Sequence, residues 1–105
     1  MTSIPTDHDA MLAALTRLIP IAMSDTGQSR RVANFLMAWW NGPDLGHFEV
    51  ADLFGLDRTV ARDITTVIGY LGQRPGAIYI DALGFAEEMQ DIIALWQKPA
   101  STSAA

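Results

Sequence analysis

The stretch GQSRRVANFLMAWWNG, residues 27–42, decides the fold. At roughly 100° of rotation per residue in an α-helix, its apolar side chains gather on one arc of about 200°. These side chains are Val32, Ala33, Phe35, Leu36, Met37, Trp39 and Trp40. A surface helix has an apolar stripe only about 100° wide, so this wider stripe must be covered on two sides. We therefore predict a central helix, sheathed by other helices, that begins near Gln28 or Ser29.

The composition fits one domain without metal or disulfides. Half of the 105 residues are hydrophobic, which is enough for a core, and there is no cysteine for a disulfide, a thiolate nucleophile or a cysteine-ligated metal. The net charge of -5 excludes a chain-wide basic field for nucleic acid or anionic lipid. The N-terminus lacks the basic start of a signal peptide, and arginines interrupt the longest apolar runs. We expect a cytoplasmic protein with no membrane span.

Helical spacing of apolar residues recurs along the chain, whereas strand patterns are nearly absent, so the predicted class is all-α. We expect a compact bundle of four to five helices. The predicted boundaries are a disordered N-terminus over 1–5, a single helical domain over 6–98 and a flexible tail over 99–105.

Proline and glycine punctuate this pattern. The first helix is expected to begin at a cap formed by Thr6 or Asp7, and Pro20 is expected to kink or break it near Ile19. The central helix is expected to end at the run Asn41-Gly42-Pro43. Further helices are predicted over 49–54, 58–71 and 85–97, with an extended segment over 77–80.

The segment ADLFGLDRTVARDI, residues 51–64, resembles a helix-turn-helix within a possible corner at 49–72. That motif places a small residue where two helices cross, a glycine four residues later and an apolar residue after the glycine. Ala51, Gly55 and Leu56 occupy these places. The exposed face of the second helix would then offer donors to phosphates and base edges. Those donors are Arg58, Thr59, Arg62 and Thr66.

The acidic residues around this segment argue against DNA. Asp57 and Asp63 lie on or beside the same face and would repel phosphate, and the flanking helices add acid. The alternative interpretation is a corner of two helices that uses the same packing without binding DNA.

Three residues of the central helix are further candidates for contact with a partner. Arg30 and Arg31 lie at the end where the helix dipole disfavours a positive charge, so each is either paired with a nearby acid or contacts an anionic partner. Trp40 lies at the edge of the apolar arc and is either covered by another helix or an anchor for a partner.

No residue pattern in the chain indicates catalysis or a cofactor. His47 with Glu49 near Asp44 is too small a set for a metal or acid–base site. The glycine runs at 27–29 and 72–76 lack the flanking residues of a nucleophile elbow or a phosphate loop. We therefore predict no enzyme and no cofactor.

Four blocks of the sequence are similar to a family of small uncharacterised bacterial proteins. They are DTGQSRRVANFL at 25–36, AWWN at 38–41, DLFGLD at 52–57 and DALGF at 81–85. Members of that family are often encoded on plasmids and integrative elements. The resemblance therefore implies an accessory protein of mobile DNA, and it carries over no functional residues.

Together these observations predict a non-enzymatic interaction or regulatory protein, monomeric or homodimeric, whose partner is another protein. The alternative hypothesis is a helix-turn-helix regulator that binds DNA through the helix at 57–71.

Overall fold

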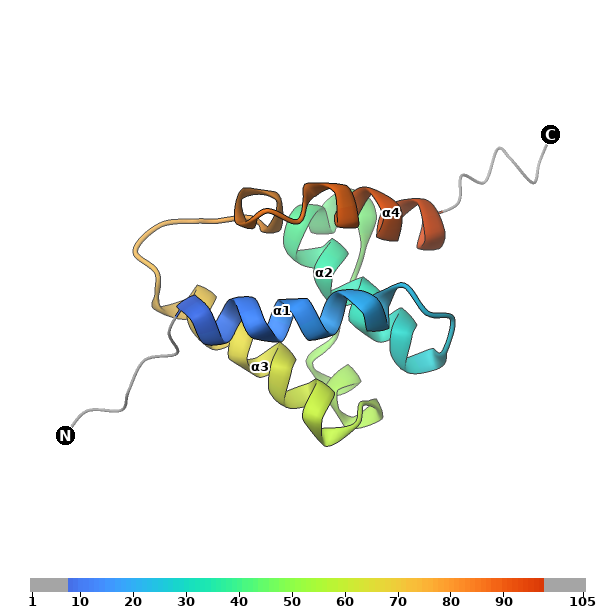
Figure 1. Cartoon of the computed structure of the whole chain (residues 1–105). Helices are drawn as coiled ribbons and strands as arrows, with labels where there is room; N and C mark the ends of the chain where they lie inside the picture. Colours follow the sequence, from blue (N-terminus) through green and yellow to red (C-terminus); the bar gives the residue numbers. More distant parts are fainter. Residues whose placement is uncertain (1–7, 98–105) are drawn as a thin grey trace.

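The computed structural model describes residues 8–97, and all regular structure within them is helical (Figure 1). This confirms the predicted all-α class. The helices are α1 (His8–Ala22), α2 (Gly27–Leu45), the 3-10 helix η1 (Val50–Gly55), α3 (Arg58–Gln73), the 3-10 helix η2 (Ile80–Leu83) and α4 (Ala86–Trp96). The predictions for the two chain ends, including the cap at Thr6 or Asp7, lie outside the described residues.

Helix α2 is covered on two sides, as its wide apolar arc predicts. It packs against α1 on one side and against α4 and η2 on the other, so the helices stack in the order α3, α1, α2, α4 (Figure 1). Five side chains of the arc are buried: Val32, Ala33, Phe35, Leu36 and Met37. Trp39 and Trp40 are partly buried against the rim of the same core.

Helix α1 runs through Pro20 to Ala22, so of the two predicted outcomes near Ile19, a kink or a break, the break is wrong. Proline removes one backbone N–H group and its ring crowds the preceding turn, but Pro20 is third from the end of α1, so little of the helix lies beyond it. The N–H of Met23 still donates to the carbonyl of Ile19 at 3.2 Å, so the hydrogen-bond ladder resumes beyond the proline.

Helix α2 begins slightly earlier than predicted because Thr26 caps it. The Thr26 hydroxyl accepts a hydrogen bond from the N–H of Ser29 at 3.0 Å. At the other end, Asn41 leaves the helical conformation (φ -156°, ψ 76°), as the predicted stop requires. One further helical turn then follows and ends at Leu45.

Helix α3 supplies the layer beneath α1. Its buried apolar residues are Val60, Ile64 and Val67. The helix ends at Gln73, two residues beyond the predicted end. Gln28 of α2 fixes its start, because the Gln28 side-chain oxygen accepts from the N–H of Asp57 at 2.6 Å.

The C-terminal elements close the other side of α2. Residues 77–79 have no regular structure and Tyr79 is extended, but Ile80, the last residue of the predicted extended segment 77–80, begins η2 instead. No strand forms anywhere in residues 8–97. Ile80, Met89 and Ile92 insert into the core. Gly84 follows η2 with φ 95° and turns the chain into α4, at the only positive φ in the described residues. The Trp96 indole N–H donates to the Ala22 carbonyl at 2.6 Å and ties the end of α4 to the end of α1.

None of the helices in the described part of the chain is both long enough and apolar enough to cross a membrane.

Candidate interaction surface

The outer face of α3 carries the four residues predicted for it. Arg58, Thr59 and Arg62 are exposed, and Thr66 is half-buried with its hydroxyl donating to the Arg62 carbonyl at 2.8 Å. Within residues 8–97, neither Arg58 nor Arg62 forms an ion pair with a carboxylate. The face therefore presents two uncompensated positive charges.

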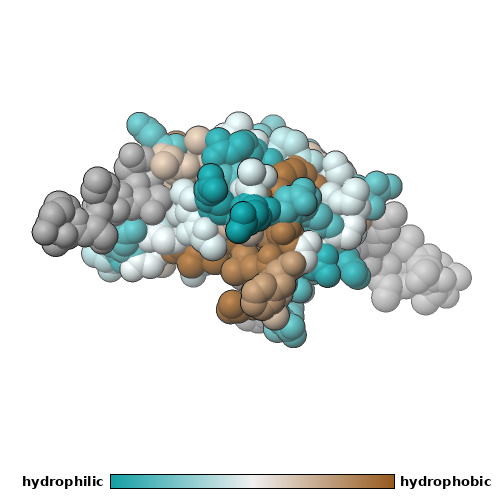
Figure 2. All heavy atoms as spheres, turned by 90° about the horizontal axis from the view of Figure 1, so that it is seen from below, coloured by the Kyte–Doolittle hydropathy of each residue, from teal (hydrophilic) through white to brown (hydrophobic). Residues whose placement is uncertain are grey.

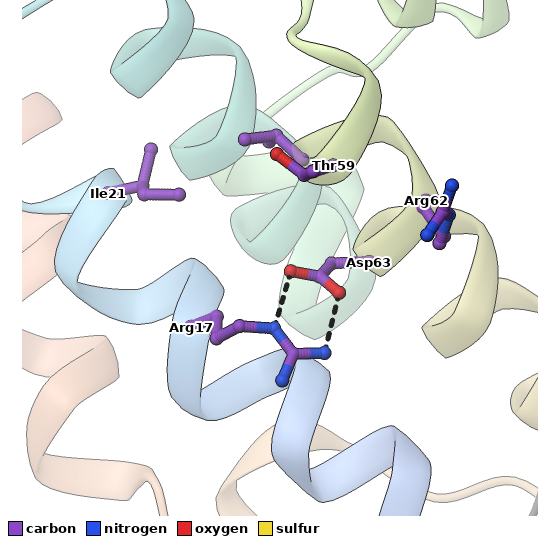
Figure 3. A pocket seen from close by; sticks show the side chains of 6 residues that line it. Arg17, Ile21, Thr59, Arg62 and Asp63 are labelled. Atoms are coloured by element: carbon purple, nitrogen blue, oxygen red, sulfur yellow. Dashed lines mark hydrogen bonds and ion pairs between the residues drawn. The ribbon is translucent and has the colours of Figure 1, made fainter.

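Asp63 does not lie on this outer face, which corrects the sequence prediction. It is 7% exposed and turns toward α1, where both of its oxygens are bonded to Arg17 (Figure 3). The Arg17 Nε donates to Oδ2 at 2.9 Å and Nη2 donates to Oδ1 at 2.8 Å. These hydrogen bonds, and then the charge of Asp63, raise the pKa of Arg17. Asp63, which the sequence predicts to repel anions at α3, is thus neutralised by Arg17 of α1.

A pocket of about 330 Å³ opens beside this ion pair, between α1 and α3. Arg17, Thr59, Arg62 and Asp63 form its polar wall, and Ile21 and Val60 line its apolar part (Figure 3). The pocket brings two of the predicted contact residues, Thr59 and Arg62, together with a guanidinium group that the sequence analysis did not select.

The predicted helix-turn-helix packing does not form. Its first limb is the 3-10 helix η1, which has no buried residue, and Ala51, the expected crossing residue, is exposed. Helix α3 packs mainly against α1 instead. Gly55 ends η1 just before α3, and a Cβ atom there would lie 2.6 Å from Cζ of Arg31, at the flexible end of that side chain. The glycine leaves room for that guanidinium group.

The two arginines at the start of α2 differ in their surroundings. The Nε of Arg31 lies 3.7 Å from Oδ1 of Asp52, and its Nη1 donates to the Gly55 carbonyl at 3.5 Å. Of the two predicted alternatives, Arg31 is therefore paired with a nearby acid, and these contacts connect η1 to α2. Arg30 is exposed and forms no ion pair within residues 8–97.

Trp40 is partly buried against the core, so the structure favours covering by neighbouring elements over a fully open anchor. Its neighbour Trp39, also partly buried, donates its indole N–H to the Ile78 carbonyl at 3.0 Å. This bond holds the extended segment before η2 against α2.

The most exposed large apolar side chains in the described residues lie on η1. Val50 is 80% exposed and Phe54 is 92% exposed. We call these two residues the η1 tip. Figure 2 shows apolar atoms projecting from the underside of the molecule, the side on which η1 and α3 lie in Figure 1. The sequence predicts a short helix over 49–54, but nothing in it marks Val50 and Phe54 as an exposed surface. No periodicity separates an exposed single helical turn from a buried one.

His47 and Glu49 approach one another to 3.3 Å on the surface, and both side chains are largely exposed. Residues 8–97 contain no group of three or more histidine and acidic side chains placed to hold a metal ion.

A family model described as "Family of unknown function (DUF7673)" matches residues 12–97. The match spans the fold from the second turn of α1 to the residue after α4. No curated protein and no solved structure matches the chain.

Proposed function

The chain belongs to DUF7673, a family of unknown function, and we propose that it is a non-enzymatic docking protein that acts by binding another protein. We also propose that the protein has a regulatory or accessory role in the bacterial cytoplasm, and that a plasmid or integrative element encodes it. That context rests on the resemblance of residues 25–96 to proteins encoded on such elements.

The observation that carries the proposal is the η1 tip. Single exposed apolar residues are ordinary on protein surfaces, but a helix of six residues that carries both a phenylalanine 92% exposed and a valine 80% exposed is unusual. An aromatic side chain contributes strongly to binding when a partner surrounds it and excludes water. The tip therefore has the character of a binding anchor.

The tip is held in place in the free protein, which lowers the entropy lost on binding. Glu49 and Asp52 form a reciprocal capping box at the start of η1. Arg31 contacts Asp52 and Gly55 from α2. Leu53, between the two exposed residues, packs against the core. The η1 tip is thus presented on a braced turn.

The experiment is capture of the partner from the native host, its identification and then calorimetry with the purified partner. Phe54→Ala should weaken binding at least tenfold, as loss of an aromatic anchor does. Tyr79→Ala is the matched control, because Tyr79 is an exposed aromatic residue (48%) on a different element. A purified partner that binds wild type and the Phe54 variant equally would refute docking at η1.

A second candidate function, DNA binding through α3, gains support from one observation. Asp63 is turned inward and paired with Arg17, so the outer face with Arg58 and Arg62 loses one of its two expected acids. The net charge of -5 still disfavours a long phosphate backbone. We therefore keep docking on a protein as the main proposal.

A further inference from the structure

The pocket between α1 and α3 is lined by both charged and apolar side chains, and none of them belongs to the η1 tip. We propose that it binds an aliphatic carboxylate. Among the residues that line it, Arg17 and Arg62 supply guanidinium groups for the carboxylate, and Ile21 and Val60 supply the apolar side for the hydrocarbon chain. This inference does not depend on docking at η1.

Hydrogen-bond donors remain available in the polar wall. Asp63 occupies Nε and Nη2 of Arg17 and leaves Nη1 without a partner in residues 8–97. The Arg62 guanidinium forms no ion pair there either, and the Thr59 hydroxyl lines the same pocket. A planar guanidinium group binds the two oxygens of a carboxylate well.

The charge of the wall selects a monoanion. Arg17 and Arg62 contribute two positive charges and Asp63 one negative charge, so the sum is +1. A carboxylate neutralises this charge. A phosphate group carries about -1.5 to -2 at pH 7, so it would leave excess negative charge next to Asp63.

The apolar side and the size of the pocket define the rest of the ligand. Ile21 and Val60 offer a surface to a hydrocarbon chain but no hydrogen-bond donor to a second polar group. At about 330 Å³ the pocket lies at the small end of ligand sites, which begin at roughly 300 Å³. A short free acid and a glutamate side chain on a partner both present this chemistry.

The test is a titration of the whole protein with sodium hexanoate, with acetate and with inorganic phosphate, each monitored by ¹⁵N–¹H correlation spectra. Hexanoate should cause saturable shifts of the amides of residues 59–63, at millimolar concentration. Each buried methylene contributes up to about fourfold in affinity, so hexanoate should bind several-fold more tightly than acetate. Arg62→Ala should weaken hexanoate binding about three- to tenfold, given a partly exposed ion pair. Arg74→Ala, which removes an arginine that follows the end of α3 and does not line the pocket, should leave it unchanged.

Blocked glutamate, N-acetyl-glutamate amide, distinguishes the two sources of the carboxylate. Butyrate, whose chain matches the glutamate side chain in length, is the reference: blocked glutamate that binds as tightly as butyrate indicates a partner's glutamate, and much weaker binding than butyrate indicates a free acid. The proposal is overturned if hexanoate causes no saturable shift, if phosphate binds more tightly than hexanoate, or if Arg62→Ala binds as wild type does. It is also overturned if a short DNA duplex shifts these amides at concentrations where hexanoate does not, because the face is then a nucleic-acid interface.

Discussion

The guanidinium group of Arg17 and the carboxylate of Asp63 join α1 to α3 through two side-chain hydrogen bonds, across 46 residues of sequence. Asp63 is buried and Arg17 remains largely exposed. Removal of Arg17 therefore leaves a buried carboxylate without its partner, whereas removal of Asp63 leaves an arginine that water can solvate.

We expect Arg17→Ala to destabilise the fold more than Asp63→Ala does. The double variant should lose less stability than the sum of the two single variants, because the second substitution removes the orphaned carboxylate. Urea unfolding of the four proteins measures the coupling. Strict additivity would show that the two side chains have no interaction energy with each other.

The raised pKa of Arg17 predicts the pH dependence of this contribution. The folded-state pKa lies above the unfolded value, so the stabilisation is fully present below the unfolded pKa and is lost only as the pH rises through the folded value. Arginine titrates far above neutrality, so Arg17 should add no pH dependence to stability between about pH 6 and 9. Comparison of wild type with Arg17→Ala at several pH values in this range checks this point.

Truncation to alanine should lower the free energy of unfolding strongly at one phenylalanine and hardly at all at another. Phe35 is 6% exposed in the centre of the core, so Phe35→Ala should cost about 3–5 kcal/mol of the free energy of unfolding. Phe54 is 92% exposed, so Phe54→Ala should stay within about 0.5 kcal/mol of wild type. Denaturant unfolding measures both. A large loss at Phe54 would mean that η1 supports the fold and would remove it as a free anchor.

The cap of the central helix is testable through Thr26. Its hydroxyl accepts from the N–H of Ser29, and also lies 2.8 Å from the Ser29 hydroxyl. Thr26→Ala should cost about 1 kcal/mol, within the usual range of 0.5–2 kcal/mol for a lost N-cap. Thr26→Ser keeps the oxygen and serves as the control, with a smaller loss expected in thermal unfolding.

Replacement by alanine should destabilise the protein at one glycine and stabilise it at another. A Cβ atom at Gly46 would lie 3.0 Å from Cβ of Met37 and 3.3 Å from the backbone of α2, so Gly46→Ala should cost about 1–3 kcal/mol. A Cβ atom at Gly72, inside α3, meets no other atom within 4 Å. Gly72→Ala should therefore stabilise the protein by about 0.5–1 kcal/mol. Thermal unfolding of both variants checks the contrast, and a stabilising Gly46→Ala would contradict the close approach to α2.

The DNA alternative has a direct test in a mobility-shift assay at about 50 mM salt, where phosphate contacts are strongest. If α3 binds DNA, Arg58→Ala with Arg62→Ala should abolish the shift, while Arg74→Ala, outside the outer face, should not. No shift for wild type under these conditions would remove the hypothesis.

The parts of the fold that depend on local sequence could be predicted, and those that depend on distant contacts could not. The arc of α2 follows from helical periodicity within 16 residues, so the burial of Phe35, Leu36 and Met37 was predictable. The pairing of Asp63 with Arg17 joins two helices far apart in sequence, and spacing along α3 alone could not reveal it.

The candidate sites show the same limit. Arg58 and Arg62 lie on the outer face of α3 as their periodicity predicts. The predicted helix-turn-helix packing was wrong, because Ala51 is exposed and α3 packs mainly against α1, which lies far away in the sequence. The proximity of Gly55 to Arg31, a residue 24 positions earlier, is another contact that local spacing does not reveal. The exposure of Phe54 depends on what packs around η1, which a six-residue segment cannot specify on its own.

The indole hydrogen bonds of Trp39 and Trp96 make intrinsic fluorescence a regional reporter. Trp39 and Trp40 lie where α2 meets the C-terminal elements, and Trp96 ties α4 to the end of α1. None of the three lies on η1 or α3. Tryptophan fluorescence should therefore change when α4 detaches from the fold. It should not change when a ligand or partner binds at η1 or α3.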